Sequence, residues 1–479
     1  MNTIFNRFWI LITVSVLLAS CNGKTNTGNG KEVAGTPVTT YDTTLKSGVI
    51  TEKVICKNDP NVSYALYIPS GYKAGNEYPV IYLFDPHADG LLPINKYKDL
   101  AEKYGYILIG SNNSKNGLAW DGVHQTIKAM FEDSQARLSI DKNRIYAGGF
   151  SGGSRVASSI AINDGGIRGV IGCSAGFPQL TKQLDNKFDF IGIAGNEDFN
   201  MTEMKNLEKN FEGTGMRHTL IIFNGKHEWC DKAIFEKAFQ WLQLNEMKDK
   251  MIDVNNQLIY EVKESYYKQI NGEEAKGKKY EALLLYKQML SFLDGVTDVS
   301  SVRKSLDSLA SLDDVKKTIQ FKTDMEKREL EIQQNYAKEF TSKDMIWWVN
   351  EINQLNTKTK SNDPETVQMY KRILGYLSLV AYSYANSSLN GNNLDQAGMY
   401  IKLYSLIDPQ NSEHSYMSAT LFAKRNQIDK VIPALKEAVK LGFDDVGRLQ
   451  NDPVFASIKN NKDFIEIVTG INKAKTDKN

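Results

Sequence analysis

Apolar residues form short runs in the first half of the chain and recur at helical spacing in the second half. Three runs of strand length are Tyr78–Phe84 (YPVIYLF), Phe188–Ala194 (FDFIGIA) and Thr219–Phe223 (TLIIF). Strands buried on both faces of a parallel sheet have this pattern, because helices cover both faces. Each run leads into polar and glycine residues. We therefore predict a mostly parallel, doubly wound α/β sheet over residues 45–249.

The pattern changes near Asn245, after which apolar residues follow a helical period, as in Tyr280–Phe292 (YEALLLYKQMLSF). Residues 376–442 repeat themselves with a period of 34 residues, and Ala385, Ala397 and Pro409 align with Ala419, Val431 and Phe443. This period and the small residues resemble tetratricopeptide repeats, whose paired helices cross closely. We predict an all-α, tetratricopeptide-like helical-repeat domain over residues 250–479, with an irregular helical bundle as the alternative.

The main candidate for chemistry is Ser151, which lies in the string DKNRIYAGGFSGGSR between a strand pattern and a helical pattern. Gly149 and Gly153 flank it in the order Gly-x-Ser-x-Gly. A serine at such a sharp turn has a strained backbone, and small neighbours leave its hydroxyl open to substrate. The chain has 35 glycines, so the string alone also fits an ordinary loop before a helix. Its interpretation as a nucleophile elbow depends on partners elsewhere.

Two such partners follow in the order nucleophile, acid, histidine that elbow-type serine hydrolases require. Asp198 comes after one apolar run and His227 after the next. Functional groups of open parallel sheets gather at the carboxyl ends of strands. Ser151 is thus the predicted nucleophile, His227 the base that accepts its proton, and Asp198 the carboxylate that orients the imidazole. Glu197, next to Asp198, is the alternative acid.

An oxyanion hole is the remaining requirement of this chemistry. The backbone amide of Gly152, directly after the nucleophile, is the predicted first donor. The loop after Tyr78–Phe84 reads DPHADG and should supply the second. Proline has no N–H, so we predict that the amide of His87 or Ala88 fills this role.

Three further residues are candidates for binding the substrate. Asn112 follows a short apolar run, Trp120 comes shortly after it, and Trp229 lies two positions beyond His227. Together they predict a pocket lined by amide and indole groups. Tryptophans at such positions are equally common as packing groups, which is the alternative interpretation.

The segments LSIDKNRIYAGGFSGGSRVA, GNEDF and NGKHEW resemble the esterase branch of the α/β-hydrolases, which contains polyhydroxybutyrate depolymerases and feruloyl esterases. The resemblance extends over residues 45–245. By position it implies a nucleophile at Ser151, an acid at Asp198 and a histidine at His227, and hence an ester hydrolase with an acyl-enzyme intermediate. Many members have His-Gly after the third strand, where this chain has FDPHADG.

The amino terminus has the pattern of a targeting segment. Arg7 precedes the apolar stretch Phe8–Ala19, which has signal-peptide length and is too short to span a bilayer. Leu-Ala-Ser-Cys, residues 18–21, closes this stretch and resembles the lipobox of bacterial lipoproteins. We therefore predict a signal peptide over residues 1–20 and a lipid on Cys21, with an ordinary cleavage site as the alternative. Residues 21–44 are predicted as a flexible tether. This would anchor the protein to a membrane of the bacterial cell envelope.

Composition narrows the remaining possibilities. The 479 residues carry a net charge of +1 without a long basic run, which argues against nucleic acid as a partner. Besides Cys21 there are Cys56, Cys173 and Cys230, an odd number that permits one disulfide at most, and we expect them to be reduced. No Cys/His set has metal-ligand spacing and no phosphate-binding loop is present, so neither a metal nor a cofactor is expected.

Three hypotheses of function follow. The first is a lipid-anchored serine hydrolase that acts on a small-molecule or polymer ester, and the second is a serine peptidase with the same triad. The third is a scaffold whose repeats bind a protein partner beside a degenerate hydrolase domain. Under the first hypothesis we expect residues 45–249 to fold alone and to hydrolyse small activated esters.

Overall fold

The computed structural model describes residue 42 and residues 44–177 and 187–476. The predicted signal peptide, Cys21 and all of the tether except residues 42 and 44 lie outside these residues. The described residues belong to one compact unit. None of the helices in this described part combines the length and the apolar character needed to cross a bilayer.

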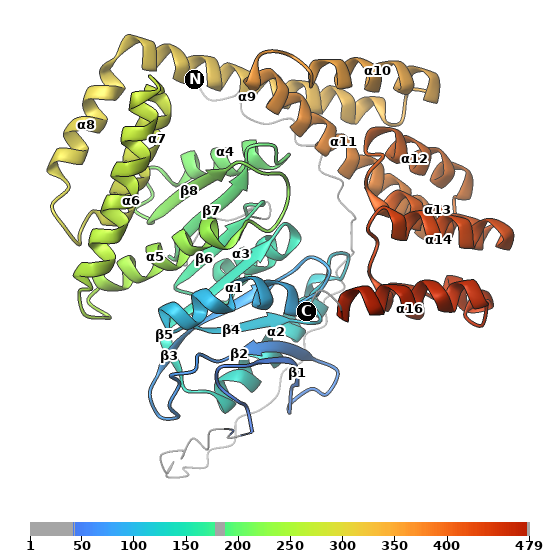
Figure 1. Ribbon diagram of the computed structural model, residues 1–479, viewed down its shortest axis with the longest axis horizontal. Helices are drawn as coiled ribbons and strands as arrows, with labels where there is room; N and C mark the ends of the chain where they lie inside the picture. The colour runs from blue at the N-terminus through green and yellow to red at the C-terminus, as the bar shows by residue number, and fades with distance from the viewer. Residues whose placement is uncertain (1–41, 43, 178–186, 477–479) are drawn as a thin grey trace, which may run out of the picture. The chain divides into compact units, whose positions relative to one another are not determined.

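The first half of the chain contains one eight-stranded sheet (Figure 1). The strands are β1 Ile50–Ile55, β2 Ser63–Tyr67, β3 Tyr78–Phe84, β4 Ile107–Ser111, β5 Ile140–Phe150, β6 Gly169–Cys173, β7 Asp189–Gly195 and β8 His218–Phe223. Their order is β1-β2-β4-β3-β5-β6-β7-β8. β3 to β8 run parallel, and β1 and β2 are antiparallel to their neighbours. The predicted mostly parallel sheet is confirmed.

Helices cover both faces of the sheet, as the continuous apolar strands require. They are α1 Leu91–Tyr104, α2 Trp120–Arg137, α3 Gly152–Asn163, α4 Met201–Phe211 and α5 Lys232–Lys248. Alternate residues of β3 point to opposite faces, so Ile81 packs with α1 and α5 while Tyr82 packs with α2 and α3. Two hydrophobic cores result, one on each face. Cys56, Cys173 and Cys230 are buried in them as free thiols.

Two further helices complete the core under α1 and α5. They are α6 Asn256–Ala275 and α7 Lys279–Leu293. Ile270, Met289 and Phe292 are fully buried in the same cluster as the sheet residues. The side chain of Gln288 also donates to the carbonyl of Leu220 in β8 at 2.9 Å. The domain boundary expected between residues 249 and 250 therefore divides a continuous hydrophobic core.

The rest of the chain is helical, as predicted. It contains α8 Ser300–Ser311, α9 Asp313–Glu339, α10 Met345–Lys358, α11 Pro364–Asn390, α12 Leu394–Ile407, α13 Ser412–Lys424, α14 Ile428–Lys440, α15 Val446–Asn451, the 3-10 helix Pro453–Ile458 and α16 Lys462–Thr476. The small residues Ala385, Ala397 and Ala419 are fully buried where neighbouring helices pack. Their tetratricopeptide-like character stays a prediction.

Candidate active site

Ser151 lies at the turn between β5 and α3, with the strained backbone angles φ 52° and ψ −118°. Few L-residues adopt a positive φ, so the surrounding structure must hold this one in place. Glycines make that possible, because a Cβ on Gly149 would lie 2.3 Å from the backbone of Gly153, and a Cβ on Gly153 would lie 1.9 Å from the carbonyl oxygen of Phe84. The start of α3 therefore packs closely against β3 and β5, and Ser151 lies at the carboxyl end of β5.

The structure brings Ser151, His227 and Asp198 together, although 76 positions separate Ser151 from His227. Nε2 of His227 lies 2.9 Å from Oγ of Ser151, and Nδ1 lies 2.9 Å from Oδ1 of Asp198. Asp198 is fully buried, and its Oδ1 also accepts the backbone N–H of Asn200 at 2.8 Å. This arrangement fixes the imidazole tautomer with the proton on Nδ1, which leaves Nε2 free to accept the serine proton.

Two aromatic rings pack against the imidazole. The ring of Phe199 stacks on His227 with centroids 4.1 Å apart, and the ring of Phe150 lies 4.8 Å away. Phe199 follows Asp198 directly, so the loop 195–200, here called the acid loop, both orients the histidine and covers it. Sequence reasoning missed Phe199, although its place next to the acid was visible. Glu197, the alternative acid, is instead paired with Lys371.

The DPHADG loop is organised around the buried carboxylate of Asp85. Oδ2 of Asp85 accepts the indole N–H of Trp229 at 2.9 Å, and Oδ1 accepts the backbone N–H of His87 at 2.8 Å. Burial raises the pKa of Asp85, but the hydrogen bonds from His87 and Trp229 outweigh it and hold the pKa below its usual value. The hydrogen bond to Asp85 conversely raises the pKa of His87. Trp229 is 7% exposed and packs beneath the site.

The two predicted second oxyanion donors are engaged within this loop. The N–H of His87 points to the Asp85 carboxylate, and the N–H of Ala88 donates to the carbonyl of Asp85 at 3.0 Å. Gly152, the predicted first donor, begins α3, where the first backbone amides have no partner within the helix. The engagement of the His87 and Ala88 amides could not be predicted from the sequence, because it depends on the turn that Asp85 imposes.

A cavity of ≈ 1540 Å³ opens above the triad, and Ser151 and His227 form part of its floor. Pockets for drug-sized ligands are usually about 300–1,000 Å³, so this one has room for a larger substrate. Of the predicted substrate-binding residues, Asn112 lines the cavity. Trp120 and Trp229 are not among the described residues that line it, and Trp120 lies 39% exposed at the start of α2.

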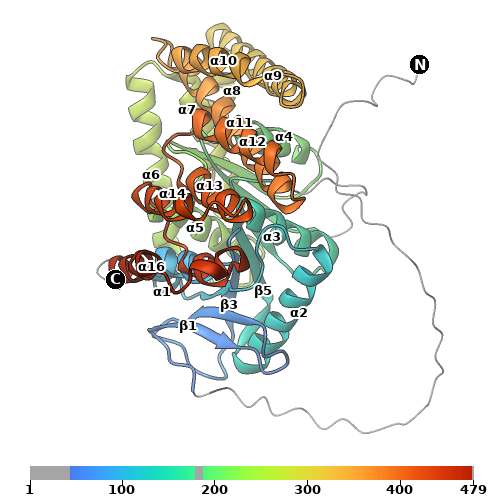
Figure 2. The ribbon, with the colours of Figure 1, turned by 90° about the vertical axis from the view of Figure 1, so that its right-hand side faces the viewer.

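The helical half of the chain forms the opposite wall of this cavity. In Figure 2 helices α11 to α14 lie on the viewer's side of the sheet. Tyr382 of α11, Tyr404 of α12 and Tyr416 of α13 line the cavity together with Arg448 of α15. The guanidinium of Arg448 lies 4.2 Å from the ring centroid of Tyr416 and donates to both carboxylate oxygens of Glu413. The candidate triad and the second half of the chain therefore share one site.

Helix α11 also holds the acid loop directly. Nη1 of Arg372 donates to the carbonyl of Asn196 at 2.7 Å, while the same guanidinium forms a buried ion pair with Glu329 of α9 at 2.6 Å. Burial raises the pKa of Glu329 above its usual value, against the opposing effect of Arg372. A Cβ on Gly375 would lie 3.3 Å from the ring of Phe199, so α11 packs closely on this loop.

We expect Arg372→Met to destabilise the protein by about 3–5 kcal/mol, because it leaves the Glu329 carboxylate buried without its partner. It should also lower kcat, since the acid loop loses its bond at Asn196. Lys371→Met is the matched control: its pair with Glu197 is partly exposed, and losing it should cost about 0–1 kcal/mol. Urea unfolding and kcat on a small ester measure both effects. Equal losses in the two variants would contradict the role of Arg372.

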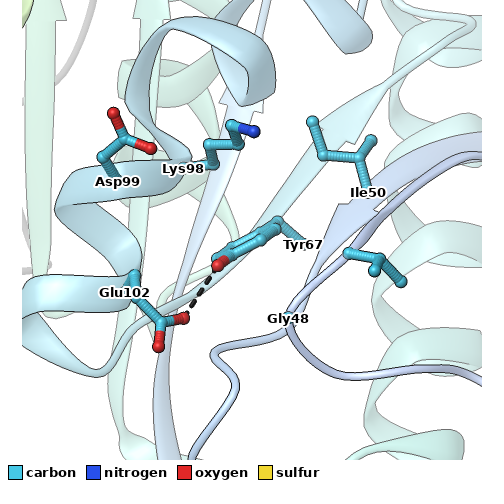
Figure 3. A pocket seen from close by; sticks show the side chains of 7 residues that line it. Gly48, Ile50, Tyr67, Lys98, Asp99 and Glu102 are labelled. Atoms are coloured by element: carbon cyan, nitrogen blue, oxygen red, sulfur yellow. Dashed lines mark hydrogen bonds between the residues drawn. The ribbon is translucent and has the colours of Figure 1, made fainter.

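A second pocket, of ≈ 410 Å³, lies on the surface between the start of β1 and α1 (Figure 3). Two carboxylates line this pocket, and one of them, Glu102, accepts hydrogen bonds from the hydroxyls of Tyr67 and Ser70. Asp99 is paired with Lys232. No nucleophile and base are paired there among the residues that line it, so the triad site remains the candidate active site. In the described part of the chain no cluster of three or more His, Cys, Asp or Glu side chains is placed to hold a metal.

Comparison with known proteins places esterases among the similar structures. No protein-family model and no curated protein matches this chain. The S-formylglutathione hydrolase of Staphylococcus aureus is 10% identical with a TM-score of 0.33, covering 38% of this chain and 92% of that one. An esterase of Pyrobaculum calidifontis is 12% identical with a TM-score of 0.34, and the match covers 44% of this chain and 87% of that one. The feruloyl esterase module of Clostridium thermocellum is 14% identical with a TM-score of 0.33, and the match covers 42% of this chain and 88% of that one. Each match covers less than half of this chain and most of the other.

Proposed function

We propose that this protein is a serine hydrolase that cleaves carboxylic esters through an acyl-enzyme, with Ser151 as nucleophile, His227 as base and Asp198 as the orienting acid. The observation that carries this proposal is the pair of 2.9 Å contacts that His227 makes with Ser151 and Asp198. In the first step Oγ of Ser151 attacks the acyl carbon and its proton moves to Nε2 of His227. The imidazolium then protonates the leaving alcohol, and water repeats the sequence to release the acid.

The size and composition of the cavity support a substrate larger than a simple short-chain ester. Its helical wall carries tyrosines, amides and paired charges, so the substrate should have a polar part that reaches from Ser151 toward Arg448. The tetratricopeptide-like helices would then act in substrate binding, in place of or in addition to the binding of a protein partner.

The test is labelling of the full-length protein, without its signal segment, by a fluorophosphonate probe, followed by a panel of esters and matched amides. Labelling at Ser151 with turnover of esters is the expected result. Turnover of amides at comparable kcat/KM would favour the peptidase alternative, and absence of labelling would favour a degenerate hydrolase domain.

We further propose that the enzyme is held in the bacterial cell envelope by a lipid on Cys21. The apolar stretch Phe8–Ala19, closed by the motif Leu-Ala-Ser-Cys over residues 18–21, supports this placement. Mass spectrometry of the mature amino terminus is expected to find an acylated Cys21. A mature chain with an unmodified cysteine, or one that begins elsewhere, would contradict it.

A further inference from the structure

The loop that should complete the oxyanion hole offers neither of its expected backbone donors. The amides of His87 and Ala88 both donate to Asp85. A tetrahedral intermediate held by the amide of Gly152 alone would lack about half of the usual stabilisation, because such sites use at least two donors aimed at the developing charge. Another N–H group must therefore reach the acyl oxygen.

The side chain of Asn116 lies beside Gly152. A Cβ on Gly152 would be 1.8 Å from Oδ1 and 2.8 Å from Nδ2 of Asn116, so its amide group lies against the residue that supplies the first donor. Asn116 lines the cavity together with Ser151 and His227. Among the described residues its side chain has no hydrogen-bond partner, and the residue is exposed to the cavity.

The backbone around Asn116 is fixed to the same loop that would otherwise form the hole. Its N–H donates to the carbonyl of Pro86 at 2.8 Å, and the neighbouring Lys115 pairs with His87 in a β-bridge. The side chain therefore extends from an anchored position. Rotation of the terminal amide exchanges Oδ1 and Nδ2 and presents the N–H group without moving the backbone.

We propose that the side-chain amide of Asn116 is the second oxyanion donor, opposite the backbone amide of Gly152. This inference rests on the proposed hydrolase function and deepens it. When Oγ of Ser151 bonds to the acyl carbon, the carbonyl electron pair moves onto the oxygen, and the two N–H groups bind that charge. When the intermediate collapses, the carbonyl re-forms, the bond to the alcohol breaks, and the alcohol takes the proton from His227.

The experiment compares full-length Asn116→Ala and Asn116→Asp with wild type on p-nitrophenyl acetate. Loss of one oxyanion donor lowers kcat by about 10²–10³-fold and leaves KM within about threefold, because the interaction is made only in the transition state. The inhibition constant of a trifluoromethyl ketone, which forms a bound oxyanion, should rise by the same factor as kcat/KM falls. Leu118→Ala is the matched control, since Leu118 lies in the same loop, is 44% exposed and is not among the residues that line the cavity.

The Asn116→Asp variant tests whether Asn116 acts as a hydrogen-bond donor or only fills space beside the oxyanion. Asp has the shape of Asn but presents a carboxylate to the oxyanion, so its loss should equal or exceed that of Asn116→Ala. Wild-type kcat in either variant, or a change confined to KM, would overturn the inference, and the Asp variant decides the matter if the Ala variant does not fold. The hydrolase proposal itself fails if the wild-type protein is neither labelled by the probe nor active on esters, or if Ser151→Ala remains active. Neither result depends on Asn116, so the two failures are distinguishable.

Discussion

Ser151→Ala is expected to lower kcat on any ester substrate by a factor of about 10⁴ to 10⁶, because the three groups of a triad act as a unit. The variant should also lose labelling by a fluorophosphonate. Stability should change little, since among the described residues the hydroxyl is hydrogen-bonded to His227 alone, and the strained backbone of Ser151 is held by the glycines around it. The measurements are kcat, probe labelling and thermal unfolding.

A matched control is Ser158→Ala on helix α3. This side chain is fully buried, and its Oγ has no hydrogen-bond partner in the described part of the chain. Removing an unpaired buried hydroxyl is close to neutral or slightly stabilising. Ser158→Ala should therefore keep full activity. If Ser151→Ala keeps activity as well, the nucleophile lies elsewhere and the triad assignment is wrong.

A fragment that ends at residue 249 is expected to lack ester hydrolysis and to unfold without a cooperative transition. This reverses the expectation from sequence that residues 45–249 work alone. The fragment loses α6 and α7, and with them the partners of Phe239, Trp241 and other residues of α5. Exposing one such side chain costs about 1.5–3 kcal/mol, and whole domains are stable by only about 5–15 kcal/mol. The free-energy cost of exposing several of these side chains therefore exceeds the free energy of unfolding of a whole domain.

A second fragment, residues 45–311, separates folding from catalysis. It keeps α6 to α8 and the complete core, but it lacks α11 and the helical wall of the cavity. We expect it to unfold cooperatively and to hydrolyse p-nitrophenyl acetate with a reduced kcat, because the acid loop loses the hydrogen bond from Arg372 to Asn196. Circular dichroism during urea unfolding and kcat/KM check both fragments. A 45–249 fragment with cooperative unfolding and wild-type kcat/KM would show that the two halves are independent.

The strands nearest the proposed triad were well predicted because they are buried on both sides and therefore carry unbroken apolar runs. Tyr78–Phe84 has the predicted bounds, and β7 and β8 differ from the predicted runs by one residue. The antiparallel strands β1 and β2 were not identified. β1 lies at the sheet edge and is mostly exposed or half-buried, so its sequence ITEKVI has no clear apolar pattern.

Contacts between the two halves of the chain could not be predicted from the sequence. Arg372 and Asn196 are 176 positions apart, and an arginine on an otherwise ordinary helix gives no sign that it bonds to an acid loop. The engagement of His87 and Ala88 depends on where the Asp85 carboxylate points, which no spacing rule reveals. The order of Ser151, Asp198 and His227 along the chain was informative, because the strands that carry them follow one another in the sheet in the same order. Short connections place strands that are consecutive in the sequence side by side.

The long separation between Arg372 and Asn196 also bears on when the candidate active site is completed during synthesis. Contacts distant in sequence form late in folding, because closing a long loop costs chain entropy before the contact offsets it. The nucleophile, acid and histidine leave the ribosome well before Arg372 and the tyrosines that face them. A growing chain would thus carry an unsupported acid loop until its last third is made, and hydrolysis should reach its full rate only in the finished protein.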